Sequence, residues 1–271
     1  MRKAIELTAV GVLVVTLCAF GAGCRNSRNR AASVVGSTSV QPFAEMLSEE
    51  FNKRNPQENV EIQGGGSQAG ILAINEGNAA IGMCSRELSK EEEKTLTAIP
   101  IAQDGLAIVV HPSNPVTNLT RDQIRKIFAG QVTNWKLLGG NDVPIRMITR
   151  EEGSGTREAF TKLVMGKEWI ANTALVQESN GAVRELVRND PGAVGYMSLG
   201  LVSIDLRAVA IDGVPPNVQN VTDHKYSLVR RFLFVVSQDG PKNQAAQKFI
   251  DYVLSPEGQT MLEKEGLVKV K

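Results

Sequence analysis

Residues 149–164 read TREEGSGTREAFTKLV and combine the end of a β-strand, a glycine-rich turn and the beginning of a helix. The partial alternation of VPIRMIT (143–149) predicts the strand, and apolar residues at helical spacing from Ala159 to Val164 predict the helix. The turn between them contains Arg150, Gly153, Ser154, Gly155 and Thr156. Backbone N–H groups at a helix N-terminus are unpaired and lie at the positive end of the helix dipole, so this join is suited to an anion. An ordinary helix cap on a loop is the alternative interpretation of the stretch alone.

Three earlier strands are followed by similar polar turns. SVV (33–35) precedes GSTSVQP, NVEIQ (59–63) precedes GGGSQ, and AAIGM (79–83) precedes Cys84-Ser85-Arg86. One such turn is uninformative, because Ser, Thr and Gly are common in turns. Four of them indicate a shared small anion, because ligands of α/β sheets lie beyond the carboxyl ends of the strands. The candidate ligands are Thr38, Ser39, Ser67, Ser85, Arg86, Arg150, Ser154, Gly155 and Thr156. For Arg86 a salt bridge to a carboxylate such as Glu87 is the alternative.

Strands that alternate with helices predict an α/β fold with a mostly parallel sheet. The strand GLAIVVHP (105–112) ends near two prolines, which marks a crossing between domains, and YSLVRRFLFVVSQ (226–238) is a long strand that carries the chain back. We therefore expect one lobe from residues 33–110 and 226–271, and a second lobe from residues 111–225. Because polar turns occur in both lobes, the site is expected in the cleft between them.

Several helix beginnings are also signalled. Thr120 with Gln123, and Ser89 with Glu92, have the spacing of capping boxes, and each predicts a helix that begins there. Asn180 is expected to cap another helix.

The N-terminus predicts an export leader. Two basic residues precede an apolar run from Leu7 to Phe20, which is short for a membrane span, and three small residues stand directly before Cys24. This arrangement resembles a bacterial lipoprotein box, which implies removal of residues 1–23 and acylation of Cys24, for example with palmitate. An ordinary secretory signal is the alternative. Residues 24–32 would form a polar tether. The expected location is extracytoplasmic, with a lipid anchor in the bacterial cell membrane.

Composition excludes several functional classes. The formal net charge is +1 and no basic tract occurs, which argues against a nucleic-acid partner. Ser67 and Ser154 do not lie in the nucleophile elbow G-x-S-x-G, and the chain has only two histidines, so a serine hydrolase is disfavoured. Neither a P-loop nor a recognisable metal-ligand spacing is present in the sequence. We expect no catalytic residues, no metal and no cofactor.

The polar turns together carry a family resemblance. GSTSVQP, GGGSQAG and REEGSGTREAF, with GAVGYMSLG and YSLVRRFLFVV, resemble the phosphate-binding component of bacterial phosphate ABC transporters, over nearly all of residues 33–271. The resemblance implies a type II periplasmic-binding-protein fold, in which two lobes close on inorganic phosphate and present it to membrane permease subunits. On the matching turns it implies phosphate contacts from Thr38, Ser39, Ser67, Arg150, Ser154, Gly155 and Thr156.

One position departs from the pattern of this family. Many members have an aspartate after the third strand, which accepts the proton of phosphate and rejects sulfate; this chain has Ser85 and Arg86 there, as in a shorter-chain branch. The acceptor would then be another group, with Glu151 and Glu152 as candidates, although either is equally suited to a solvated first-turn carboxylate. A phosphate sensor or adhesion protein, a binder of sulfate or another tetrahedral oxyanion, and a phosphate-ester hydrolase are the alternative functions.

Overall fold

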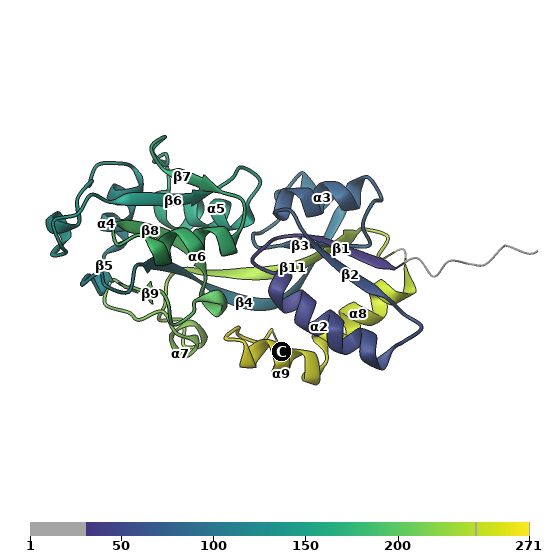
Figure 1. Cartoon of the computed structure of the whole chain (residues 1–271). Coiled ribbons are helices and arrows are strands. Elements are labelled where there is room, and N and C mark those ends of the chain that lie inside the picture. Colours follow the sequence, from purple (N-terminus) through teal and green to yellow (C-terminus); the bar gives the residue numbers. More distant parts are fainter. Residues whose placement is uncertain (1–30, 242, 271) are drawn as a thin grey trace, which may run out of the picture. The chain divides into compact units, whose positions relative to one another are not determined.

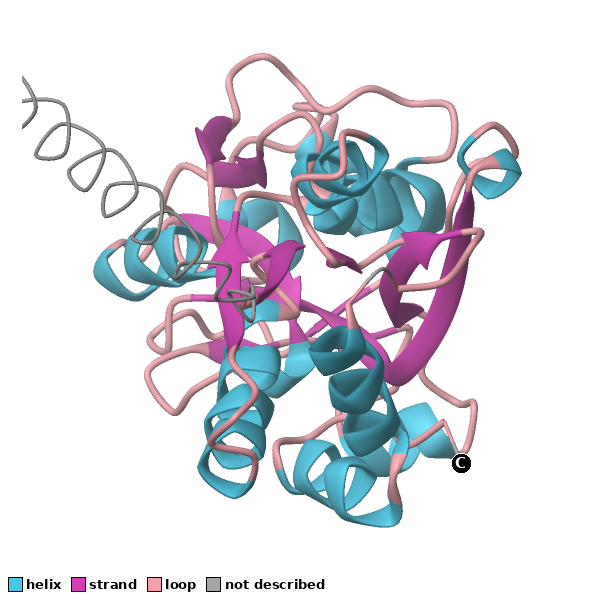
Figure 2. Cartoon of the chain, turned by 90° about the vertical axis from the view of Figure 1, so that its right-hand side faces the viewer, coloured by secondary structure: helices cyan, strands magenta, loops and turns pink. Residues whose placement is uncertain are grey.

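The structure is a computed structural model that describes residues 31–241 and 243–270. The expected leader, Cys24 and most of the tether lie outside these residues. In the described part of the chain, most strands form a mixed sheet in the order β2-β1-β3-β11-β4-β8-β6-β7, with β9 beside β4, and β5 and β10 form a small second sheet (Figure 1). Helices flank these strands on both sides (Figure 2). Within the same residues, no helix combines the length and apolar character needed to cross a membrane.

Parallel strands and three helices surround a first hydrophobic core. The strands are β1 (Ala32–Gly36), β2 (Val60–Gly64) and β3 (Ile81–Cys84), and the helices are α2 (Gln41–Arg54), α8 (Gln244–Leu254) and α9 (Pro256–Lys264). The helix α3 (Ser67–Asn75) packs Ile71 and Ile74 in a separate, smaller cluster. Phe43, Leu47 and Phe51 recur at helical spacing on α2 and are buried. The ring of Phe51 meets that of Phe249 edge-on, with centroids 5.5 Å apart. This first core therefore joins the beginning of the described chain to its end.

A second hydrophobic core is built from the middle of the chain. Its strands are β6 (Arg146–Arg150) and β8 (Ala193–Ser198), and its principal helices are α4 (Arg121–Phe128) and α5 (Gly155–Phe160). The strand β7 (Leu175–Gln177) pairs with β6, and α6 (Asn180–Asn189) packs Val183 and Val187 in an adjoining smaller cluster. Shorter elements complete this part of the fold: β5 (Asn118–Leu119), β9 (Arg207–Ala208), β10 (Ala210–Ile211), α7 (Val218–Thr222) and the turns η2 (Trp135–Leu138), η3 (Thr161–Met165) and η4 (Leu199–Leu201). The rings of Phe160 and Tyr196 stack with centroids 4.1 Å apart, which fixes α5 against β8.

Two long strands take part in both cores. β4 (Leu96–Val110) and β11 (Val229–Ser237) pair antiparallel with each other and connect the two groups of elements in Figure 1. Ile101 and Ala102 of β4 belong to the first core, whereas Leu106 and Ile108 belong to the second. Between these two parts, Asp104 of β4 stands opposite Arg230 of β11. Two charged residues thus occupy the point where both strands pass from one core to the other.

The sheet differs from the mostly parallel arrangement that the sequence predicts. The pairs β1–β2, β1–β3, β6–β7 and β6–β8 are parallel, but β4 and β11 run antiparallel to all their neighbours. The reason is that these two strands are crossings between cores and are not parts of local strand–helix–strand units.

The capping signals have different outcomes. Thr120 and Gln123 form the predicted capping box at the beginning of α4. Ser89 and Glu92 also make both bonds of a capping box, but only the 3-10 turn η1 (Glu92–Lys94) follows, so the prediction of a helix there is wrong. The chain enters β4 at Leu96, and pairing with β11 leaves no residues to extend the turn.

Candidate anion-binding site

Hydroxyl groups from both cores meet at the carboxyl ends of the strands. Ser39 follows β1 and Thr156 opens α5, and their oxygens Oγ and Oγ1 are 2.6 Å apart. The Ser37 hydroxyl donates to Ser85 Oγ at 2.9 Å, and the Ser85 N–H donates to Ser67 Oγ at 3.1 Å. All of these residues are at most 2% exposed. These hydroxyls bond to one another in this structure, and the same groups can donate to a polar ligand that enters the cluster.

Gly155 fits tightly into this hydroxyl cluster. A Cβ atom at this position would lie 2.3 Å from Ser67 Oγ and 2.8 Å from Ser85 Oγ. Any side chain would therefore displace the serines that follow β2 and β3. The preceding residue, Ser154, is the N-cap of α5, and its hydroxyl accepts from the Arg157 N–H at 3.2 Å. Gly155 thus permits the close approach that brings the turns of the two cores together.

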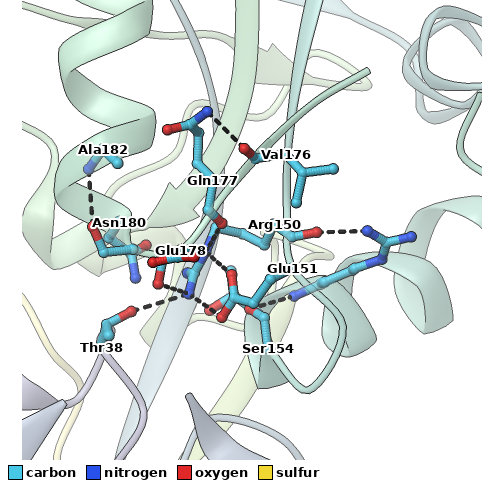
Figure 3. A network of polar contacts seen from close by, with 12 residues as sticks. Thr38, Arg150, Glu151, Ser154, Val176, Gln177, Glu178, Asn180 and Ala182 are labelled. Carbon is cyan, nitrogen blue, oxygen red and sulfur yellow. Dashed lines mark hydrogen bonds and ion pairs between the residues drawn. The ribbon is translucent and has the colours of Figure 1, made fainter. Parts of the chain in front are cut away.

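Arg150 lies at the end of β6, and its side chain is only 1% exposed. Figure 3 shows its guanidinium between Thr38 and the segment that leads into α6. Its Nη2 donates to Thr38 Oγ1 at 3.1 Å and to the Glu178 carbonyl at 3.2 Å, and Nε and Nη2 each donate to a carboxylate oxygen of Glu151 at 2.9 Å. The positive charge is thereby held beside the cluster and partly balanced by Glu151.

Asn180 also belongs to the cluster, although the sequence suggested only a helix cap. The cap of α6 is Ser179, whose hydroxyl accepts from the Ala182 N–H, so the prediction for Asn180 is wrong by one residue. Because the amide of Asn180 is not used for capping, it points to Ser39. With its oxygen facing the cluster, it accepts from Ser39 Oγ at 2.7 Å and from Arg150 Nη1 at 3.2 Å.

Asp104 and Arg230 extend the cluster at the strand crossing. Arg230 Nε donates to Asp104 Oδ2 at 2.9 Å and Nη1 donates to Thr156 Oγ1 at 2.8 Å, while the Ser198 hydroxyl donates to Asp104 Oδ1 at 2.7 Å. Burial raises the pKa of the Asp104 carboxyl and lowers the pKa of Arg230, and the attraction between the two opposes both shifts. Asp104 and Arg230 were not among the candidates from the sequence, although Asp104 is the only charge within apolar β4 and Arg230 is one of two adjacent arginines at the beginning of apolar β11.

Arg86 has a different environment from the other candidates. Its Nη1 and Nη2 donate to Glu92 at 2.7 and 2.8 Å, and its Nε lies 2.7 Å from Glu158 Oε2 on α5. The hydrogen bond from Arg86 holds the pKa of Glu92 below its ordinary value of 4.5. The structure therefore brings Ser85 into the cluster but pairs the Arg86 guanidinium with two carboxylates.

A cavity of about 660 Å³ has a lining that includes Arg86, Glu152, Gly153, Arg157, Val229 and Arg230. Of the two carboxylates considered as proton acceptors, Glu151 is paired with Arg150, whereas Glu152 is exposed and lines this cavity. Among residues 31–241 and 243–270, no three His, Cys, Asp or Glu side chains are grouped as a metal site would require. The arrangement can therefore offer N–H and O–H donors from several directions to an oxyanion.

The fold agrees with comparisons to known proteins. Residues 25–257 match a family model described as a PBP superfamily domain. The Bacillus subtilis phosphate-binding protein PstS is 30% identical over 246 residues, which cover 88% of this chain and 80% of that protein. PstS of Borreliella burgdorferi is 30% identical over 261 residues, which cover 92% of this chain and 93% of that protein.

Solved structures of phosphate-transport proteins are also similar to this chain. A phosphate ABC transporter substrate-binding protein from Clostridium perfringens, solved with bound phosphate, is 41% identical with a TM-score of 0.86, and the match covers 89% of this chain and 100% of that one. An ABC-type phosphate transport receptor from Vibrio cholerae is 40% identical with a TM-score of 0.72, over 87% of this chain and 98% of that one. The fold is that of the periplasmic binding proteins. The chain belongs, within the PBP superfamily, to the family of PstS phosphate-binding proteins.

Proposed function

We propose that this protein is the extracytoplasmic substrate-binding component of a phosphate ABC importer. It captures inorganic phosphate and delivers it to the permease subunits in the membrane. The observation that carries the proposal is the buried cluster in which hydroxyls from both cores meet the Arg150 guanidinium. The names of the relatives and the bound phosphate in the Clostridium perfringens structure support the choice of ligand.

The chemistry of the cluster suits a tetrahedral oxyanion. A multiply charged anion is costly to bury unless its oxygens receive several hydrogen bonds, and charge-assisted bonds from a guanidinium are about twice as strong as neutral ones. The proposed ligands are Thr38, Ser39, Ser67, Ser85, Arg150, Ser154, Gly155 and Thr156. Arg86 is left out of this set, because its guanidinium donates to Glu92 from both Nη atoms and forms an ion pair with Glu158.

Binding is proposed to work by closure of two lobes, without covalent chemistry. Residues 33–110 with 226–271 form the first lobe, and residues 111–225 form the second. Ser39 and Thr38 come from the first, and Thr156 and Arg150 from the second, so contacts between them form only when the lobes meet. A ligand that bonds to both lobes has a higher affinity for the closed arrangement than for the open one, and it therefore increases the population of the closed arrangement.

Calorimetric titration with phosphate, arsenate, sulfate and molybdate tests the function. We expect saturable phosphate binding at micromolar or lower concentration, weaker sulfate binding, and no turnover of a chromogenic phosphate ester. No phosphate binding below millimolar concentration would contradict the proposal. Equal affinity for sulfate would retain an oxyanion receptor but overturn the phosphate selectivity.

We also propose that Cys24 carries the lipid that anchors the protein to the cell membrane. The support is the order of basic residues, apolar run, small residues and cysteine in residues 1–24. Metabolic labelling with a palmitate analogue should mark the wild-type chain but not Cys24→Ser. Equal labelling of both would contradict the anchor.

A further inference from the structure

Arg230 is a buried arginine whose hydrogen-bond donors are only partly used. Its side chain is 3% exposed, and its carbon Cζ lies 5.1 Å from the centroid of the Phe232 ring. Nε donates to Asp104 and Nη1 donates to Thr156 Oγ1, but Nη2 is buried and has no partner among the described residues. A buried guanidinium N–H without a partner is unfavourable. We therefore expect Nη2 of Arg230 to donate to an acceptor that is not one of the described residues, such as a bound ligand.

The position of Arg230 connects it to the hydroxyl cluster. Thr156 Oγ1 accepts from Arg230 Nη1 at 2.8 Å and is also 2.6 Å from Ser39 Oγ. One hydroxyl therefore joins Arg230 to a ligand candidate from the first core. Arg230 and Val229 also line the 660 Å³ cavity together with Gly153, so β11 contributes to the same region as the turn before α5.

Asp104 holds the guanidinium in a fixed orientation. The carboxylate is 1% exposed and accepts from both Arg230 and Ser198, so the Nε edge of Arg230 is directed toward β4. Nη2 stands between Nε and Nη1 in the planar fork, so one of its N–H groups lies on the Nε edge and the other lies on the edge that it shares with Nη1, which faces Thr156. Glu151 has a corresponding relation to Arg150, because it balances the charge while other donors face the cluster. Both arginines thus offer N–H groups beside a carboxylate that offsets their charge.

We propose that Arg230 is a second anion-binding arginine, which donates from Nη2 to an oxygen of the bound phosphate while Asp104 positions it. This inference rests on the proposed function and extends its ligand set to the strand that links the two cores. Bound phosphate would then contact the turns of both cores and also the crossing of β4 and β11. The polar turns after strands do not point to Arg230, because Arg230 lies within β11.

The first experiment is calorimetry on the purified protein and two variants. Arg230→Lys keeps the charge but loses the planar fork, and the double variant Arg230→Gln/Asp104→Asn removes both charges and leaves no unpaired buried ion. We expect each to lose on the order of 10- to 100-fold in phosphate affinity, the range for one or two charge-assisted hydrogen bonds. Thermal unfolding of the double variant should stay close to that of the wild type.

Arg231→Gln is the matched control. Arg231 is the next residue of β11, is half exposed, and pairs with Glu87 and not with a hydroxyl of the cluster. Its loss should leave phosphate affinity within about twofold, because exposed pairs contribute little. If the wild type binds phosphate and the double variant binds it with the same affinity, the proposed role of Arg230 is wrong but the proposed function stands. Absence of binding by the wild type would overturn the proposed function as well.

Nitrogen-15 NMR of the arginine side chains provides a test that needs no substitution at Arg230. The Nη2 resonance of Arg230 should shift as phosphate is added to the wild-type protein, and its hydrogens should exchange more slowly with water at saturation. The Arg231 variant serves only to assign signals. Binding of phosphate with no change in the Arg230 Nη2 signal would contradict the proposal, whatever the stability of the variants.

Discussion

Arg150 ends strand β6 and Arg86 follows strand β3, and the sequence made both of them candidate anion ligands. Both side chains are mostly buried, and both contact glutamates. Arg150 nevertheless reaches a hydroxyl of the first core through Nη2, whereas the donors of Arg86 are directed to Glu92 and Glu158. The contacts of the two arginines, and not their positions after strands, thus separate the proposed anion ligand Arg150 from the carboxylate-bound Arg86.

The same comparison separates binding from stability. Arg150 is placed to act on a ligand that both cores share, and Arg86 is placed to join the loop after β3 to helix α5. Substitution at Arg150 should therefore change mainly phosphate affinity, and substitution at Arg86 should change mainly the free energy of unfolding.

Arg150→Gln should lower phosphate affinity by about 100-fold or more, because it removes the charge and two or more charge-assisted hydrogen bonds. Calorimetric titration measures the effect. Arg146→Gln on the same strand is the control, since Arg146 is exposed and pairs with Asp190. Similar affinities for the two variants would remove Arg150 from the site.

Thr156→Val should lower phosphate affinity by about 10-fold, the value of one lost hydrogen bond at a buried position. The valine has nearly the same shape but leaves Ser39 and Arg230 without the hydroxyl that links them. Thr156→Ser keeps the hydroxyl and should restore most of the affinity. Equal affinities of the Val and Ser variants would contradict a role for the hydroxyl, and retention of affinity by Val with its loss in Ser would assign the effect to the methyl group.

Arg86→Gln should leave phosphate affinity within about threefold while lowering the free energy of unfolding by about 1–3 kcal/mol, because Glu92 and Glu158 lose a shared partner. Urea unfolding and phosphate titration on the same preparation separate the two effects. A loss of affinity as large as that of Arg150→Gln would show that Arg86 binds the anion after all.

The Arg86–Glu92 pair also predicts a pH dependence. Because the pKa of Glu92 is lower in the folded protein than its ordinary value of 4.5, the pair stabilises the fold above that value and the contribution is lost as pH falls through the folded-state pKa. Glu92→Gln should therefore flatten the fall in unfolding free energy below pH 4.5 and change phosphate affinity least of all. An acid profile identical to that of the wild type would contradict the assignment.

Much of the fold and part of the site could be predicted from local sequence. The polar turns after β1, β2 and β3 and the Thr120 capping box depend on residues within a few positions of each other, and periodicity detects them. The likeness of the turn before α5 to the other three correctly indicated that they converge, as the contact between Ser39 and Thr156 shows.

The residues that were missed depend on tertiary register. Asp104 and Arg230 are 126 positions apart, and only the antiparallel pairing of β4 with β11 places them opposite each other. Asn180 was assigned to capping because an asparagine before a helix usually caps it, yet Ser179 takes that role and leaves the amide for Ser39. Arg86 was ambiguous for the same reason, since its partner Glu158 lies on an element of the other core.

The central claim is that turns from both cores bind one phosphate, and backbone amide NMR tests it most directly. In a single phosphate titration of the purified protein, the N–H signals of Ser39 in the first core and of Gly155 and Thr156 in the second should shift together with one common midpoint. Shifts confined to one core, or two separate midpoints, would contradict the shared site.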